Sequence, residues 1–360
     1  MISVSLCMIV KNEEKVLQRC LESVKDLVDE INIIDTGSSD RTKEIASRYT
    51  DRIYDFKWID DFAAARNYSF SKATKEYTFW LDADDILLPD DQEKFLKVKE
   101  TFEPIYDSVK MVYALDRSTT GEFSNSLMRN RLVKTEKGYK WIGKVHEYLE
   151  VIGTVFTSDI CVTHLSIKTG KTDRNLRIYE KQKEEGVPFS PRDLYYYGNE
   201  CYELGEFKKA FESYRAFLDT EKGWVEDCIG AYDKGGECLL QLGREKEAEL
   251  FFYESFVHDL PRANICCKLG YLYLSQRKYY QAVHWYRTAS EADYNRVKNT
   301  GAIVNGAYYT WLPHLQLCVC YDAMGKYEQA YYHNEMARLY NPMHPSVLSN
   351  KEYLEKKLSD

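Results

Sequence analysis

Several sequence features that mark common classes of protein are missing from this chain of 360 residues. No apolar run reaches the roughly 20 residues that a membrane-spanning helix needs, so we expect no membrane span. The chain has 49 Lys and Arg against 57 Asp and Glu, and this net charge of −8 argues against nucleic acid as the main partner. The ten cysteines contain no Cys-x-x-Cys pair, so we expect them to pack inside a cytoplasmic, reduced protein.

A glycine-rich phosphate-binding loop is also missing. The segment that follows the expected first strand, residues 11–14, reads Lys-Asn-Glu-Glu and contains no glycine. A dinucleotide-binding protein or a nucleotidyltransferase needs glycines there, because backbone N–H groups must approach the phosphates closely. The sequence disfavours both classes, and we expect any nucleotide diphosphate to be held through a metal ion.

The most informative segment that is present is residues 79–85, Phe-Trp-Leu-Asp-Ala-Asp-Asp. It reads as a buried strand that carries a cluster of carboxylates to its C-terminal end, where ligands bind in open α/β sheets. Carboxylates gathered in this way repel one another unless a hard divalent cation such as Mg²⁺ or Mn²⁺ lies among them. The alternative is a solvated acidic turn that leads to Pro89.

The first half of the chain alternates short apolar strands with helices. We expect strands at 2–10, 30–35, 52–56 and 77–82, and helices at 14–24, 41–49 and 62–73. Repeated β–α units predict a mostly parallel sheet with helices on both faces. Further strands, with no long helices between them, are expected at 109–115, 127–134, 139–143, 148–152 and 160–164. They predict a mixed or antiparallel extension of the sheet.

From about Thr172 onward the pattern is helical and repetitive. A glycine precedes an alanine by five residues at three places, and an arginine replaces the glycine at a fourth. The pairs are Gly205 with Ala210, Gly243 with Ala248, Arg277 with Ala282, and Gly325 with Ala330. This pattern resembles the tetratricopeptide repeat, whose helix pairs recur about every 34 residues and need small residues where helices cross. The longest spacing, 282 to 330, requires an insertion near residues 294–309.

Three further polar segments follow the first three expected strands. They are residues 11–14, residues 35–40, and the Arg66-Asn67 pair. The carboxyl ends of parallel strands lie at one edge of a sheet, so these segments should meet the acidic segment there. Together they supply carboxylates and amides for a base and a ribose, and an arginine for phosphate.

These segments carry a family resemblance. Residues 5–14, 34–40, 65–67 and 82–84 resemble, in order, the motifs of glycosyltransferase family 2 enzymes with the GT-A fold, over about residues 3–165. Residues 141–147 look like the Gly-x-Val-His-Glu segment of a bacterial subgroup. That subgroup includes lipopolysaccharide-core glucosyltransferases and bacteriocin-peptide glycosyltransferases, some with C-terminal tetratricopeptide repeats.

The resemblance implies a role for each matching residue at the donor site. Asp35 would contact uracil, and Glu13 would lie near the base or the ribose. Arg66 would lie near the diphosphate. Asp84 would ligate Mn²⁺ or Mg²⁺ as part of the Asp-x-Asp motif, with Asp82 toward the ribose or a metal-bound water.

The resemblance also implies roles for later residues. Glu147 matches the position of the catalytic base in inverting members, and His164 resembles the histidine that often completes the metal coordination. His146 is an alternative ligand or an acceptor-side contact. Arg131 and Arg129 alternate on one strand face and could meet phosphate or acceptor, but a solvated face is equally compatible with the sequence.

Each of these roles has a structural alternative. Glu13 could be only a charge that the helix dipole favours at a helix N-terminus. Arg66 could pair with a nearby aspartate at the surface, and Glu147 could be an exposed strand residue. His164 could be a buried, hydrogen-bonded histidine. Asp85 is expected to be a solvated bystander.

The sequence therefore predicts a GT-A domain, an α/β fold with a Rossmann-like mixed sheet, at 1–172. A helical linker at 173–192 and an all-α tetratricopeptide-repeat solenoid at 193–360 should follow. The predicted function is metal-dependent, inverting transfer of a sugar, from a nucleotide diphosphate sugar such as a UDP-sugar, to a peptide or protein. The repeats, rich in tyrosine, would help to recognise this acceptor.

Other functions stay open at this point. The acceptor could instead be a glycan, lipid-linked or cell-surface saccharide, with the repeats used to form a homodimer. A non-catalytic repeat scaffold with a decayed transferase domain is less compatible with the intact Asp82, Asp84 and Glu147.

Overall fold

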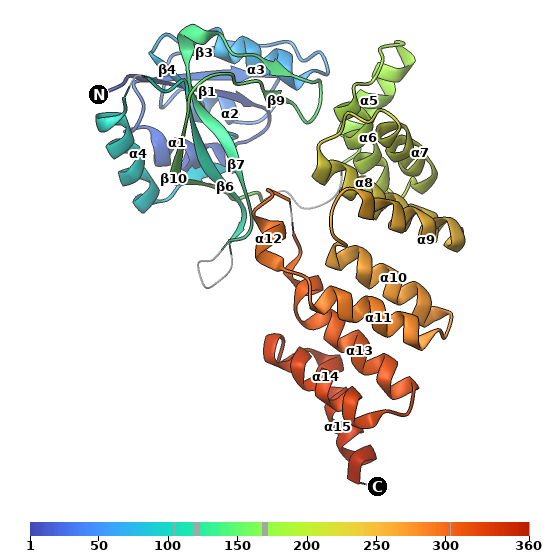
Figure 1. Ribbon diagram of the computed structural model, residues 1–360. Coiled ribbons are helices and arrows are strands. Elements are labelled where there is room, and N and C mark those ends of the chain that lie inside the picture. The colour runs from blue at the N-terminus through green and yellow to red at the C-terminus, as the bar shows by residue number, and fades with distance from the viewer. Residues whose placement is uncertain (104, 118–122, 168–171, 303, 360) are drawn as a thin grey trace. The chain divides into compact units, whose positions relative to one another are not determined.

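The computed structural model describes residues 1–103, 105–117, 123–167, 172–302 and 304–359 (Figure 1). The chain divides into two compact units, Met1–Gly186 and Val187–Asp360. The division falls inside the segment 173–192 that the sequence marks as a linker, and the helix α5 (Arg174–Glu184) belongs to the first unit.

The first unit is built on an eight-stranded mixed sheet with the strand order β3-β2-β1-β4-β7-β6-β10-β5. The strands are β1 (Val4–Val10), β2 (Glu30–Asp35), β3 (Ile53–Asp55), β4 (Tyr77–Trp80), β5 (Asp85–Leu87), β6 (Ser108–Arg117), β7 (Phe123–Lys134) and β10 (Val155–His164). The first four expected strands pair in parallel, with β1 between β2 and β4. Strand β7 then pairs antiparallel with β4 and β6, so the expected mixed extension is confirmed.

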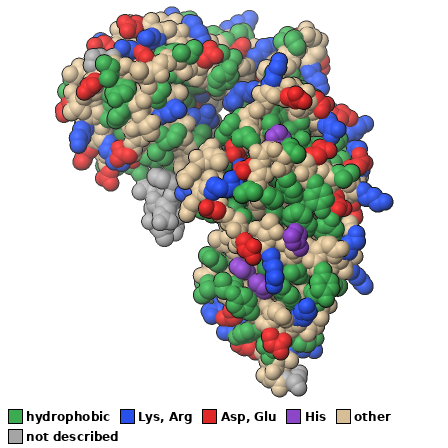
Figure 2. Space-filling model, in the orientation of Figure 1, with side chains coloured by type: hydrophobic (Ala, Val, Ile, Leu, Met, Phe, Trp, Pro, Cys, Tyr) green, Lys and Arg blue, Asp and Glu red, His purple; other side chains and the backbone are tan. Residues whose placement is uncertain are grey.

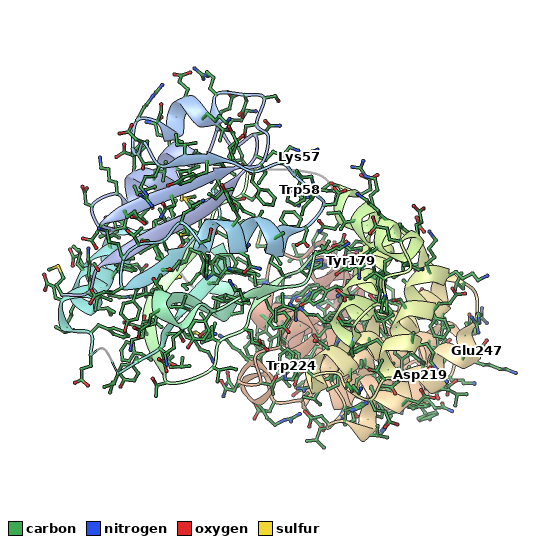
Figure 3. The ribbon with its side chains drawn as sticks, turned by 90° about the horizontal axis from the view of Figure 1, so that it is seen from above. Lys57, Trp58, Tyr179, Asp219, Trp224 and Glu247 are labelled. Atoms are coloured by element: carbon green, nitrogen blue, oxygen red, sulfur yellow. The ribbon has the colours of Figure 1, made fainter. Side chains whose placement is uncertain are left out.

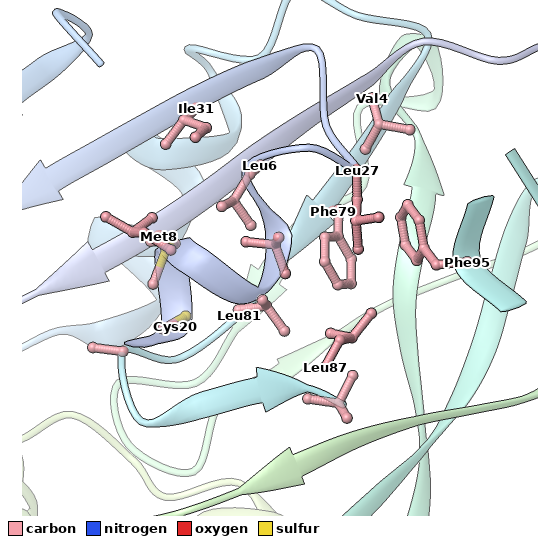
Figure 4. Packing of buried hydrophobic residues seen from close by; sticks show 14 of the residues in the cluster. Val4, Leu6, Met8, Cys20, Leu27, Ile31, Phe79, Leu81, Leu87 and Phe95 are labelled. Carbon is pink, nitrogen blue, oxygen red and sulfur yellow. The ribbon is translucent and has the colours of Figure 1, made fainter. Parts of the chain in front are cut away.

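The helices of this unit are α1 (Leu17–Val24), α2 (Thr42–Ala46), α3 (Phe62–Phe70), α4 (Pro89–Thr101) and α5. Apolar residues alternate along β1, so Leu6 and Met8 enter a core that also holds Cys20 of α1 and Phe95 of α4 (Figure 4). The intervening Cys7 points to the other face, where its thiol donates to a carbonyl of α3. Helices therefore pack on both faces of the sheet, and the ends of the strands lie between these two layers of helices.

The structure differs from the sequence expectations after residue 85. Helix α4, with Pro89 at its first turn and Asp90 next to it, was not expected, and β5 adds an edge strand before it. The expected strands at 139–143 and 148–152 shrink to a separate hairpin of β8 (Trp141–Ile142) and β9 (Tyr148–Leu149). The five residues between them form the loop that carries Glu147, so this loop, and not a strand, presents the residue.

The second unit holds only helices among its described residues. Its helix pairs are α6 (Pro191–Glu203) with α7 (Phe207–Leu218), α8 (Val225–Gln241) with α9 (Glu245–Glu254), α10 (Ala263–Ser275) with α11 (Tyr279–Ser290), and α13 (Trp311–Ala323) with α14 (Tyr327–Tyr340). The short helix α12 (Tyr294–Lys298) occupies the expected insertion, and α15 (Pro345–Ser359) follows the last pair. This arrangement confirms the predicted helical repeats.

Small residues permit the close crossing of each pair. The four alanines of the sequence pattern are all fully buried (Ala210, Ala248, Ala282 and Ala330). In three pairs a glycine on the first helix also lies against an aromatic ring of the second, as Gly236 does against Phe252. The turn between helices needs a left-handed residue, which explains the glycines there, and Arg277 adopts a φ of 58° at the corresponding position.

No helix among the described residues is long and apolar enough to serve as a membrane span. On the face shown in Figure 2, acidic and basic side chains are interspersed, and no broad patch of one sign is visible.

Candidate active site

A large cavity lies at the C-terminal edge of the parallel strands. Strands β1, β2 and β4 end at Val10, Asp35 and Trp80, so the loops after them emerge on the same side of the sheet. The cavity has a volume of about 580 Å³. Its lining residues are Ile9, Val10, Lys11, Asn12, Glu13, Thr36, Trp58, Phe62, Arg66, Asp82, Ala83, Asp84, Val145, His146, Glu147, Arg174 and Asn175.

Helix α5 contributes Arg174 and Asn175 to this cavity although it follows the sheet in sequence. The helix carries Tyr179 (Figure 3), whose hydroxyl donates to the Val145 carbonyl at 3.5 Å. Lys181 Nζ, on the same helix, lies 2.6 Å from Asp60 Oδ2, and both contacts hold the helix to the unit. The sequence assigned this stretch to a linker, and nothing in its composition pointed to the cavity.

The acidic segment forms a tight turn between β4 and β5. The Asp85 amide donates to the Asp82 carbonyl at 3.0 Å, and the Asp82 amide donates back to the Asp85 carboxylate at 3.1 Å. As a result Asp82 and Asp84 line the cavity, whereas Asp85 points into the protein and is fully buried. The expectation that Asp85 is a solvated bystander is wrong.

One group of possible metal ligands occurs among the described residues, formed by Asp84, Asp85 and His164. Strand β10 pairs antiparallel with β5, which sets His164 directly opposite Asp85, and ligand atoms of the three residues lie within 4.8 Å of one another. Carboxylate oxygens suit Mg²⁺ and Mn²⁺, and an imidazole nitrogen is compatible with a transition metal. The residues present therefore fit a divalent cation of this kind.

His164 is held in an acidic environment. The hydrogen bond to Asp85 raises the pKa of His164 above its usual value, and the charges of Asp84 and Asp82 act in the same direction. Its Nδ1 lies 3.2 Å from Asp85 Oδ1 and 3.0 Å from the Tyr113 hydroxyl.

Arg66, from helix α3, bridges two of the predicted functional carboxylates. Its Nη2 donates to Asp82 Oδ1 at 2.8 Å and its Nε to Glu147 Oε1 at 2.5 Å. The guanidinium also lies over the rings of Trp80, at 5.1 Å, and Trp141, at 4.7 Å. The sequence alternative of a surface pair with an aspartate of the preceding loop does not apply, because only 11% of this side chain is exposed.

These ion pairs shift the pKa values of the cluster. Burial alone would raise the pKa of Asp82, but the charges of Arg66 and Arg131 outweigh burial and lower it. Burial would lower the pKa of Arg66, and Asp82 and Glu147 raise it instead. Both shifts favour the ionised forms of Asp82 and Arg66.

A second, smaller cavity of about 290 Å³ meets the first at this cluster. It is lined by Arg66, Trp80, Asp82, Tyr113, Met128, Arg129, Asn130, Trp141, His146, Glu147, Tyr148 and Leu149. Four residues line both cavities, namely Arg66, Asp82, His146 and Glu147. His146 has a φ of 49°, a left-handed conformation that is uncommon outside glycine and shapes the loop at this junction. Glu147 thus lies where contents of the two cavities would meet.

The remaining predicted residues lie in three different settings. Glu13 lines the larger cavity. Asp35 is almost fully buried and accepts hydrogen bonds from the Gly37 and Ser38 amides of its own turn, so Thr36 and not Asp35 lines the cavity. Arg129 lines the smaller cavity.

Arg131 fits neither alternative that the sequence left open, a contact to phosphate or acceptor or a solvated face. Its side chain is fully buried, and its Nη1 lies 3.1 Å from Asp85 Oδ2. The guanidinium is stacked between Trp80, at 3.9 Å, and Tyr113, at 4.3 Å. The pairing of β7 with β6 is irregular here, because Val109 pairs with Leu132 and the next residue, Lys110, pairs with Asn130. Arg131 has no partner in this register, so simple alternation does not relate it to Arg129.

Several residues that shape the site were missed from the sequence. Trp80, Trp141 and Tyr113 surround the arginines. Trp80 and Trp141 lie in segments that the sequence singled out, but their rings were given no role there. Asn67, read as an amide for the nucleotide, instead holds the β8 hairpin, because its side chain accepts from the Trp141 amide at 2.9 Å and donates to the Trp141 carbonyl at 3.0 Å. The signal for such contacts lies in long-range pairing and not in local sequence.

Comparison with known proteins agrees with this geometry. Residues 5–147 match the family model described as glycosyl transferase family 2. The SPbeta prophage-derived glycosyltransferase SunS of Bacillus subtilis (strain 168) is 29% identical over 277 residues, which cover 71% of this chain and 62% of SunS. The chain thus spans less than two thirds of the length of that relative.

Two further proteins are similar to parts of this chain. A TPR repeat-containing protein of Synechococcus elongatus is 50% identical over 88 residues, which are 24% of this chain and 22% of that protein. Among solved structures, the glucosyl-3-phosphoglycerate synthase of Mycobacterium tuberculosis, in complex with Mn²⁺ and UDP-glucose, covers 53% of this chain and 81% of its own, with 16% identity and a TM-score of 0.37.

Proposed function

We propose that this chain, whose residues 5–147 match the glycosyl transferase family 2 model, transfers a sugar from a nucleotide diphosphate sugar to a peptide or protein acceptor. A UDP-linked donor is the one that we favour. The observation that carries the proposal is the position of Asp84 and His164 beside a cavity of about 580 Å³ that also holds Arg66 and Glu147. A volume of this size suits a nucleotide sugar.

The reaction that this geometry supports is a single displacement at the anomeric carbon with inversion. A divalent cation held by Asp84 and His164 would neutralise the negative charge that develops on the departing diphosphate. Glu147 would accept the proton of the attacking group, for which it must lie within about 3 Å of the attacking atom. Arg66 Nε donates to Glu147 Oε1 in the structure, so Oε2 would be the oxygen that accepts the proton while Arg66 stays in this position.

The helical repeats support a peptide or protein acceptor. Repeat units of this type stack their helices and offer extended surfaces for other chains. Several tyrosines remain exposed on these helices, among them Tyr271, Tyr280 and Tyr332, and such rings combine apolar area with a hydrogen-bonding hydroxyl. Other tyrosines, such as Tyr214 and Tyr286, pack between the helices. All ten cysteines are free and buried, which suits the cytoplasmic location that we also propose.

A donor screen tests the proposal. The full-length protein is mixed with Mn²⁺ or Mg²⁺ and a panel of uridine and guanosine diphosphate sugars, and its thermal unfolding is followed. A bound donor at 100 times its Kd should stabilise the native state by about 2.7 kcal/mol and raise the midpoint by roughly 5–10 °C. No shift with any donor would count against the proposal.

Two matched pairs of variants assign the residues. Asp84→Ala should abolish metal-dependent donor hydrolysis and transfer, whereas Asp90→Ala, at an exposed aspartate of α4, should leave both unchanged. Glu147→Gln should retain donor binding and lose transfer, whereas Glu150→Gln, at an exposed position of the same hairpin, should behave as the wild type. Near-normal turnover of Glu147→Gln would mean that another group is the base.

A further inference from the structure

We infer that Asp85 is a positioning residue, which fixes the ring of His164 and the turn between Asp82 and Asp84 and touches neither donor nor metal itself. This inference rests on the proposed function, because the residues that it positions belong to the proposed metal and donor site. It concerns an aspartate that lines neither cavity and is fully buried.

Both carboxylate oxygens of Asp85 are engaged by the protein. Oδ2 accepts from the Asp82 amide at 3.1 Å and lies 3.1 Å from Arg131 Nη1. Oδ1 lies 3.2 Å from His164 Nδ1. Asp84, by contrast, keeps 18% of its side chain exposed and lines the larger cavity. Asp84 Oδ1 also lies 3.5 Å from His164 Nδ1, but of the two aspartates only Asp85 is withdrawn from the cavity with partners at both oxygens.

The contact to His164 selects one form of its ring. Nδ1 lies 3.2 Å from Asp85 Oδ1, 3.0 Å from the Tyr113 hydroxyl and 3.5 Å from Asp84 Oδ1. A carboxylate can only accept hydrogen bonds, so we assign the proton of the neutral ring to Nδ1 and its hydrogen bond to Asp85 Oδ1, the nearer of the two carboxylate oxygens. In the neutral ring the lone pair then resides on Nε2, which becomes the nitrogen able to bind a metal. A histidine ligand that donates its other N–H to a carboxylate is held in orientation and is more basic toward the metal.

Arg131 is the counter-charge of Asp85 at a position that solvent does not reach. Both side chains are 0% exposed, and the rings of Trp80 and Tyr113 enclose the guanidinium. A buried ion pair is weak evidence for a stabilising role, because an apolar pair of similar volume often serves the fold equally well. We therefore assign this pair to the fixed geometry of His164 and of the acidic turn.

Two variants of the full-length protein separate positioning from stability. Asp85→Leu with Arg131→Met replaces the ion pair by apolar side chains and removes the acceptor for His164. Arg131→Lys keeps a cation beside Asp85 and keeps that acceptor, but it loses the stacked guanidinium. The measurements are Mn²⁺ binding by electron paramagnetic resonance of the free ion, the thermal midpoint, and the ¹⁵N shifts of the histidine rings.

The double variant should bind Mn²⁺ 10- to 100-fold more weakly than the wild type while it stays folded. Arg131→Lys should bind Mn²⁺ within about threefold of the wild type even if its thermal midpoint falls. In selectively ¹⁵N-labelled protein, the resonances that disappear in His164→Gln identify His164 among the seven histidines. These resonances should show the Nδ1–H form in the wild type and in Arg131→Lys, and lose that preference in the double variant.

The outcomes that overturn the inference are distinct from those that overturn the proposed function. Wild-type affinity for Mn²⁺ in the folded double variant, or an Nε2–H form of His164 in the wild-type protein, refutes the positioning role. The ring form in the wild type decides the matter even if the double variant fails to fold. Absence of Mn²⁺ binding by the wild type, or unchanged binding by His164→Gln, refutes the proposed metal site instead.

Discussion

Replacement of Arg66 by methionine should destabilise the first unit, because two carboxylates pair with this cation. Arg66 pairs with Asp82 at 2.8 Å and with Glu147 at 2.5 Å, and its own side chain is 11% exposed. Methionine preserves much of the apolar stem that packs against Trp80 and Trp141, so the change removes mainly the charge and its hydrogen bonds.

The expected cost follows from the burial of the partners. Loss of one member of a buried ion pair costs about 3–5 kcal/mol, because the other charge stays buried without compensation. Glu147 is 12% exposed, but Asp82 is 35% exposed and can recover part of its hydration. We therefore expect Arg66→Met to lower the free energy of unfolding by about 3 kcal/mol, at the lower end of that range.

The assay must report on the first unit alone, because the chain has two units and its unfolding need not be two-state. Urea denaturation followed by hydrogen–deuterium exchange of peptides from β1, β4 and β7 meets this requirement. Arg41→Met is the matched control, since Arg41 is 71% exposed and lies 3.4 Å from its partner Glu14, and it should cost less than about 0.5 kcal/mol.

A double variant tests the cause. If the unpaired charge of Glu147 causes the loss of stability, the double variant Arg66→Met with Glu147→Gln should lose less than the two single variants lose together. The difference in the free energy of unfolding should be about 1 kcal/mol or more. A loss below about 1 kcal/mol in Arg66→Met, or strict additivity in the double variant, would refute the view that Arg66 neutralises this cluster.

Three further predictions concern the helical repeats. Gly236→Ala should cost about 1–3 kcal/mol in urea unfolding, because the new Cβ would lie 2.2 Å from the buried ring of Phe252, and unchanged stability would contradict this packing. Arg277→Gly should stabilise the protein by up to about 1 kcal/mol and so raise its thermal midpoint slightly, because glycine adopts the φ of 58° without backbone strain. A lower midpoint would mean that contacts of the arginine side chain stabilise the protein by more than the strain costs. Burial, with the charges of His314 and Arg287, lowers the pKa of His333 from 6.5 to about 4. The unfolded chain therefore takes up a proton between about pH 6.5 and 4 that the native state refuses, so stability should be full above pH 6.5 and fall by roughly 2–3 kcal/mol toward pH 4. Hydrogen exchange of α13 and α14 at both pH values checks this, and His333→Gln should lose that part of the acid sensitivity.

The sequence predicted the elements of the first unit well where local pattern is sufficient. Strands β1, β2 and β4 are apolar runs that are followed by polar loops. The alternation of strands and helices along the chain implies a parallel sheet with a ligand site at one edge. The repeats were equally visible, because the spacing of small residues reflects the close crossing of helices. The family motifs were recognised from the same local segments.

The sequence failed where an outcome depends on partners that are distant in the chain. Arg131 and Arg129 look alike on β7, yet one lines a cavity and the other is fully buried. Asp84 and Asp85 are neighbours in the sequence, yet the Asp84 side chain lines the larger cavity and the Asp85 side chain is fully buried. No local pattern distinguishes the members of either pair.

The sequence by itself therefore determined the two-part architecture, the sheet edge at which the candidate functional residues lie, and the types of chemical group available there. The tertiary structure alone decided how these groups are paired. Arg66 reaches Glu147 across 81 positions of the chain, and His164 meets Asp85 across 79. Such contacts follow from strand order and register, which are set by the packing of the whole sheet and by the energetic need to pair buried charges.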